Sequence, residues 1–196
     1  MDINFFYKEN LGMKKILLAA LLITVSSMLF SAKKGGVTMP NKLKIKGTSL
    51  VLNGLGIREA TIFNVDVYVA GLYLEKKSKN ASSIMNSNGL KYIKIQFVRA
   101  VDKDDITEAW TKAFKKVVGR RFNNYKSRVV QLNGYMTKTK VGTITAYAFS
   151  DDGVDVWVGG RKKGTIKGKE FAKAMLSIWL GSSPPNHGLK TGMLGK

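Results

Sequence analysis

The spacing of apolar and polar residues predicts several strands in the first half of the chain. Residues 61–74 are apolar almost without interruption and rich in β-branched and aromatic side chains, but too short for a membrane-spanning helix. We therefore expect a strand buried on both faces, at the centre of a sheet. Residues 50–57 predict another strand, and Leu43, Ile45 and residues 92–98 alternate with polar positions, as half-buried strands do.

Two amphipathic helices are predicted. In the first, Ile106, Trp110 and Val117 fall on one face, with aspartates before the helix and basic residues at its end, as N-capping and the helix dipole favour. The second runs from Phe171 to Trp179 and is stopped by glycine and proline. Weaker helical patterns occupy residues 81–85, 122–135 and 186–194.

Three further strands lie between the two helices, over residues 143–149, 154–158 and 161–167. Asp-Asp-Gly and Gly-Gly sequences separate them, which is typical of hairpins. Strands followed by a helix, then a meander and a second helix, predict one α+β domain with antiparallel pairing.

The N-terminus has the pattern of an export signal. Lys14 and Lys15 precede fifteen apolar residues, 16–30, and small side chains follow. We interpret residues 1–12 as an upstream extension, 13–32 as a signal peptide and 37–196 as the folded domain, which predicts a periplasmic protein. An uncleaved anchor is the alternative, although a transmembrane helix needs about 20 apolar residues.

Composition excludes several kinds of chemistry. The chain has no cysteine and one histidine, His187, so thiol catalysis, thiolate metal sites and most imidazole-based sites are ruled out. The aspartates at 102, 104 and 105 suit a helix N-terminus better than a metal site. Gly54-Leu55-Gly56 is not a phosphate loop, because no helix start follows it. We predict no metal and no cofactor.

The net charge of +20 is unusually high. Such a charge favours anionic partners such as nucleic acid, anionic lipid or acidic polysaccharide. The lysines are scattered, however, and mostly alternate with apolar residues, so we interpret them as a solvated exterior and expect no nucleic-acid partner. Peripheral contact with anionic components of the cell envelope stays open.

Arg58 is the most distinctive candidate for a binding role, because it stands beside the most apolar strand of the chain. A guanidinium in that position needs an internal partner or a bound anion. Glu59, Asp66 or a backbone carbonyl are the internal alternatives. Trp110, Trp179 and Tyr73 are expected in the core, and Trp157 can face either side of its sheet.

Several motifs along the chain together resemble a known family. They are N-G-x-G-x-R at 53–58, F-x-V-x-V-Y-V-A-G-L-Y-L-E at 63–75, F-V-R-x-V at 97–101, D-I-T-E-A-W at 105–110, the run 164–185 and L-K-T-G-M-L-G at 189–195. Their order and spacing resemble the chalcone isomerase family, and most of all its exported bacterial branch, the chalcone isomerase-like proteins. The resemblance spans nearly all of residues 43–195.

The resemblance implies an open-faced β-sandwich, in which helices cover one face of a large antiparallel sheet and a ligand cleft lies between them. An arginine at the position resembling Arg58 steadies the substrate phenolate in the isomerases. In the fatty-acid-binding relatives, an arginine and a tyrosine hold the carboxylate, and Tyr68 stands where that tyrosine falls. The isomerases have a threonine there, so this chain departs from the catalytic pattern.

Three functions follow as hypotheses. The first is non-catalytic binding of a small amphipathic anion such as a fatty acid, held by Arg58 and Tyr68; a guanidinium fork and a phenol suit a carboxylate. The second is an intramolecular lyase of the chalcone isomerase type, which closes a ring in a phenolic enone and uses Arg58 to stabilise charge. The third is an envelope protein that interacts through its basic surface.

Overall fold

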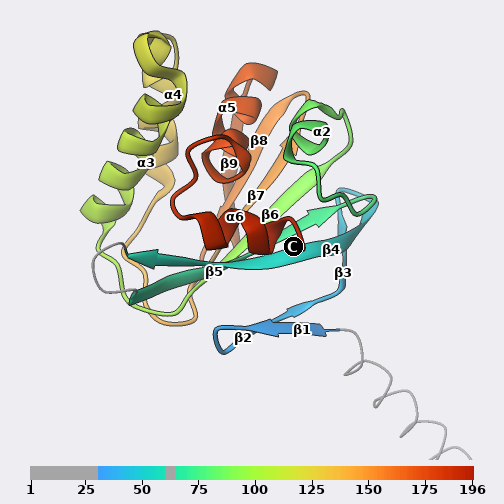
Figure 1. The fold of residues 1–196 in the computed structure, drawn as a ribbon. Helices are drawn as coiled ribbons and strands as arrows, with labels where there is room; N and C mark the ends of the chain where they lie inside the picture. The colour runs from blue at the N-terminus through green and yellow to red at the C-terminus, as the bar shows by residue number, and fades with distance from the viewer. Residues whose placement is uncertain (1–30, 61–64) are drawn as a thin grey trace, which may run out of the picture. The chain divides into compact units, whose positions relative to one another are not determined.

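The computed structural model describes residues 31–60 and 65–196 (Figure 1). The predicted upstream extension and signal peptide lie outside the described residues, except for Ser31 and Ala32. Residues 32–196 make one compact unit, which contains both hydrophobic clusters found among the described residues. Within the described ranges, no helix combines the length and apolar character required to cross a membrane.

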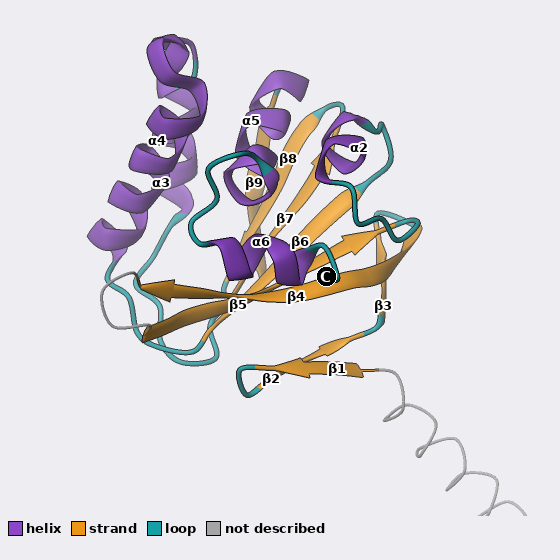
Figure 2. Ribbon diagram, in the orientation of Figure 1, coloured by secondary structure: helices purple, strands orange, loops and turns teal. Residues whose placement is uncertain are grey.

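The main sheet has seven strands, and every neighbouring pair is antiparallel. The strands follow one another in sequence order across the sheet (Figure 2): β3 (Lys42–Ile45), β4 (Thr48–Ala60), β5 (Val65–Leu74), β6 (Lys91–Phe97), β7 (Ile144–Ser150), β8 (Gly153–Val158) and β9 (Arg161–Lys167). The predicted α+β class and the large antiparallel sheet are confirmed.

Helices cover one face of this sheet, which we call the inner face (Figure 2). Helix α5 packs on β7, β8 and β9, α6 packs on β4 and β5, and α3 packs against α5. The helices are α2 (Ala81–Asn86), α3 (Lys103–Val118), α4 (Lys126–Tyr135), α5 (Lys169–Leu180) and α6 (His187–Met193), with a 3₁₀ turn, η1 (Gly119–Asn124), between α3 and α4. The weak helical pattern at 122–135 thus divides into η1 and α4.

Strand β5 is buried on both faces, as the sequence predicts. Ala70, Leu72 and Leu74 point into the inner cluster, under the helices. Val69 and Tyr73 point the other way, into a second cluster on the outer face. The alternation of a strand places these two sets on opposite faces, so β5 separates two cores.

A short hairpin on the outer face is absent from the sequence prediction. It consists of β1 (Ser31–Lys34) and β2 (Val37–Pro40), on the side of β4 and β5 away from α6 (Figure 1). Val37 and Met39 are almost completely buried in the outer cluster. The sequence predicts no strand here, because two apolar residues among lysines, glycines and a threonine give too short a pattern.

An ion pair shows how strongly the sheet curls. Lys46, in the turn between β3 and β4, lies 3.0 Å from the carboxylate of Asp155 in β8. Strands β4 and β8 are four places apart in the sheet order, which in a flat sheet would separate them by roughly 19 Å at about 4.8 Å per strand. A lysine side chain does not span that gap, so the sheet bends around its outer face.

Asp155 is held by more than one partner. Lys162 also pairs with it, at 2.9 Å, and the Thr165 hydroxyl donates to the same carboxylate. Burial alone would raise the pKa of Asp155, but these hydrogen bonds outweigh it and lower the pKa. The buried charge is therefore fully paired, which is the condition under which an ion pair inside a protein is tolerated.

Two glycines let α6 approach the backbone of β4. A Cβ atom on Gly54 would collide with the carbonyl oxygen of Gly192, and one on Gly56 with that of Leu189. The Asn53 amide donates to the carbonyl of Met193 at 2.9 Å, which fixes the helix along the strand. The glycines thus serve close backbone packing.

We expect Gly56→Ala to destabilise the protein by about 3 kcal/mol, because its methyl group would force α6 away from β4. The measurement is the free energy of unfolding from urea titrations. Gly134→Ala is the matched control: it lies near the end of α4 with no atom within 4 Å of the added Cβ, so stability should stay the same or rise by up to about 1 kcal/mol. Equal losses in both variants would contradict this account.

Candidate functional site

A cavity of about 450 Å³ lies between the inner face of the sheet and helices α3 and α5. Its floor comes from the central strands and its roof from the helices. Apolar side chains dominate the lining, and they include Val67, Ile95, Phe97, Ile106, Trp110, Val117, Met136, Val158, Ile178 and Trp179. The volume lies within the range of about 300–1,000 Å³ that is typical of small-molecule sites.

Arg58 and Tyr68 face each other across two paired strands. They are register partners in the β4–β5 ladder, next to a β-bulge that follows Arg58, and both line the cavity. Gly54, Gly56 and Arg58 occupy alternate positions of β4 and therefore lie on the same face of the strand. Helix α6 packs against the two glycines, and Arg58 follows them on that face. The structure therefore brings together the two residues that the sequence singled out.

The Arg58 guanidinium is half-buried and donates to the backbone carbonyl of Glu59. One of the internal partners considered from the sequence, a backbone carbonyl, is therefore present. Among the described residues, no carboxylate forms an ion pair with Arg58. A guanidinium has five N–H donors in a planar fork, so several remain for a ligand in the cavity.

The Tyr68 hydroxyl is oriented by a tryptophan. The indole Nε1 of Trp179 in α5 donates to the Tyr68 oxygen at 3.2 Å. Because the indole N–H can only donate, the phenol oxygen accepts there and keeps its own hydrogen for another partner. Tyr68 thus offers a donor on the side of the cavity where Arg58 lies.

The surroundings of Tyr68 favour the neutral phenol. Burial raises the pKa of Tyr68, and this effect outweighs the Trp179 hydrogen bond and the nearby Arg58 charge, which both lower it. Tyr68 therefore stays protonated at neutral pH and acts as a hydrogen-bond donor. A cationic fork beside a neutral donor is an arrangement that suits an anion.

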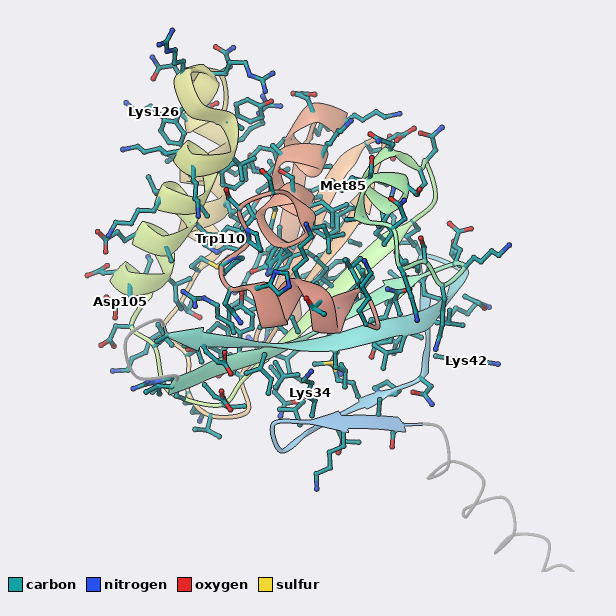
Figure 3. The ribbon with its side chains drawn as sticks, viewed as in Figure 1. Lys34, Lys42, Met85, Asp105, Trp110 and Lys126 are labelled. Atoms are coloured by element: carbon teal, nitrogen blue, oxygen red, sulfur yellow. The ribbon has the colours of Figure 1, made fainter. Side chains whose placement is uncertain are left out.

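Several aromatic side chains pack together in the wall of the cavity. Trp110 packs edge-to-face on Tyr147 and on Trp179, with ring centroids 5.5 Å apart in both pairs, and Figure 3 shows Trp110 pointing from α3 toward the sheet. Tyr68 packs on Phe97 in the same manner at 5.8 Å. Such pairs are stabilising, and they form the wall against which Tyr68 packs.

The other aromatic residues and the histidine singled out in the sequence lie in different parts of the fold. Trp110 and Trp179 are buried as expected, and both also line the cavity. Tyr73 lies in the outer cluster and donates to the carbonyl of Pro40 at 2.9 Å, and Trp157 packs on Tyr92 on that same face. His187 is exposed at the start of α6.

The structure adds cavity residues that the sequence did not indicate. Tyr147 and Thr145 lie on β7 and line the cavity, and burial raises the pKa of Tyr147. In the sequence both look like ordinary inward positions of a strand, so only the observation that their strand faces a cavity distinguishes them. Within the described part of the chain, no group of three or more His, Cys, Asp or Glu side chains is placed to hold a metal ion.

Comparisons with known proteins give two findings. A family model described as chalcone isomerase-like matches residues 31–195. The crystal structure of a fatty-acid binding protein from Arabidopsis thaliana is similar, with a TM-score of 0.68 and 17% identity over 84% of this chain and 95% of that chain. At this identity the likeness concerns the fold alone. No curated protein sequence gives a significant match.

The raised pKa of Tyr68 predicts a pH effect on stability. Above about pH 10 the unfolded chain loses its tyrosine protons while buried Tyr68 keeps its own, so the free energy of unfolding falls by up to about 1.4 kcal/mol per pH unit for this group. We expect a shallower fall in Tyr68→Phe than in the unmodified protein. Urea unfolding between about pH 9 and 11.5 measures both slopes, and identical slopes would contradict the burial of this hydroxyl.

Proposed function

Because the chain belongs to the chalcone isomerase-like family, as the sequence resemblance predicts, we propose that it binds a small amphipathic anion such as a fatty acid without chemical change. The carboxylate of the ligand lies between Arg58 and Tyr68, and its apolar part occupies the rest of the cavity. The observation that carries the proposal is that these two side chains meet on neighbouring strands at the wall of an otherwise apolar cavity.

The charges and donors of the site favour an anionic head group. Arg58 supplies a fixed positive charge, and Tyr68 supplies a neutral donor whose oxygen is already engaged by Trp179. Hydrogen bonds from a charged donor to a carboxylate are about twice as strong as neutral ones, and they strengthen further where water is excluded. A neutral apolar ligand would leave the guanidinium without that partner.

The cavity walls favour an apolar tail. Side chains such as Ile95, Phe97 and Val158 form its floor, and Ile106 and Ile178 come from the helices above. Each methylene transferred from water to such a surface contributes about 0.8 kcal/mol. The similar Arabidopsis thaliana protein is described as a fatty-acid binding protein, which supports this ligand class over a fully polar anion.

We expect Arg58→Ala to weaken fatty-acid binding about 10- to 100-fold, since a charged hydrogen bond contributes about 1.5–3 kcal/mol. Arg58→Lys should recover part of the affinity, because it restores the charge but not the fork. Displacement of a fluorescent fatty acid measures all variants, with thermal unfolding to confirm that they fold.

The matched control is Arg161→Ala, which removes an exposed arginine at the start of β9, outside the cavity lining. It should bind as the unmodified protein does. Unchanged affinity in Arg58→Ala would end the proposal. Turnover of a chalcone well above its spontaneous rate, lost in Arg58→Ala, would support the intramolecular lyase instead.

The apolar tail site makes a second prediction. Among saturated fatty acids, affinity should rise about fourfold for each added methylene, in line with about 0.8 kcal/mol per buried CH₂, until the cavity is full. It should then level off or fall. Calorimetric titrations across a chain-length series measure this, and an affinity independent of chain length would show that the tail lies outside the cavity.

A further inference from the structure

The distribution of charge along the chain is uneven in one region. Between Glu108 and Asp151 there is no acidic residue, while nine lysines and arginines occur there. Five of them gather where α3 ends, η1 follows and α4 begins: Lys115, Lys116, Arg120, Arg121 and Lys126. We call these five residues the basic tip. Figure 3 labels Lys126 at this end of the α3–α4 pair and Asp105 at the other.

We propose that the basic tip docks the protein on a membrane that carries anionic phospholipid. All five side chains are exposed, and among the described residues none of the five forms an ion pair. Elsewhere lysines pair with carboxylates, as Lys138 does with Asp102 and Lys169 with Asp151. The tip is therefore a concentration of positive charge that the fold does not neutralise.

An anionic surface would relieve the repulsion within the basic tip. The five like charges of the basic tip repel one another, and the chain supplies no acidic side chain nearby in sequence to offset this. A lysine or arginine near an anionic membrane gains roughly 1 kcal/mol, so five together give useful affinity at low ionic strength. Added salt should weaken the attraction, because it screens exposed charges.

The position of the tip beside the cavity favours a lipid membrane over a polyanion such as nucleic acid. Lys116 belongs to the tip and also lines the cavity, and Lys112, one turn earlier, lines it too. An apolar side chain accompanies these cations: Phe122 follows Arg121 in the sequence, and the Lys115 amine lies 5.4 Å from the centre of its ring. This step rests on the proposed function: an amphipathic ligand partitions into bilayers, and a protein docked by the tip holds its cavity close to that source.

The test is sedimentation of residues 32–196 with vesicles of phosphatidylglycerol and phosphatidylcholine, compared with phosphatidylcholine alone. We expect binding to the anionic vesicles only. In Arg120→Glu/Arg121→Glu the affinity should fall at least about 25-fold, from about fivefold for each cation removed. Both positions are exposed on η1, so the fold should be unaffected.

The matched control is Lys42→Glu/Lys44→Glu, which makes the same change in net charge on β3, away from the helices (Figure 3). This variant should keep most of its affinity for the anionic vesicles. An equal loss in both double variants would overturn the proposal, because only the total charge would then matter. Binding to a DNA duplex or heparin as tight as to the vesicles, and equally sensitive to the tip charges, would also overturn it.

Ligand binding in the absence of vesicles separates this proposal from the proposed function. Arg120→Glu/Arg121→Glu should bind fatty acid as the unmodified protein does, whereas Arg58→Ala should lose the fatty acid and still sediment with anionic vesicles. Loss of vesicle binding in Arg58→Ala would overturn the assignment of docking to the tip.

Discussion

The close contact between helix α6 and strand β4 is the constraint on which the site depends. The contact requires residues without a Cβ at positions 54 and 56. It is stabilised by a hydrogen bond that the Asn53 amide donates to the carbonyl of Met193. Asn186, just before α6, donates to the carbonyl of Ile57 at 3.0 Å, next to Arg58. Because the strand is fixed along this length, the guanidinium at its end has a defined position opposite Tyr68.

The charge state of the site follows from its burial. Tyr68 lies near a positive charge and accepts a hydrogen bond, both of which favour the phenolate, yet burial outweighs them and raises its pKa. Arg58 therefore keeps its positive charge beside a neutral hydrogen-bond donor, instead of forming an internal ion pair with a tyrosinate. An anion that enters meets attraction from both groups, and the low polarity around them strengthens that attraction.

Much of this architecture follows from local sequence patterns. The two long helices, the hairpins after Ile144 and the doubly buried strand β5 are regular enough to be predicted from spacing and turn residues. The hairpin β1–β2 is not, because the burial of Val37 and Met39 depends on residues far along the chain. The family resemblance indicated Arg58 and Tyr68, but the cavity, and with it the role of Tyr147, arises from how helices sit on the sheet, which no local pattern encodes.

The inner face of the sheet carries both the larger apolar cluster and the cavity. A cavity of about 450 Å³ in the inner core forgoes packing contacts that a filled core would have. On the outer face the β1–β2 hairpin covers the second cluster, and Lys46 and Lys162 both pair with Asp155. A ligand that fills the cavity adds stability by mass action. The larger of the two apolar clusters nevertheless lies on the inner face, so the cavity is set within a well-packed core.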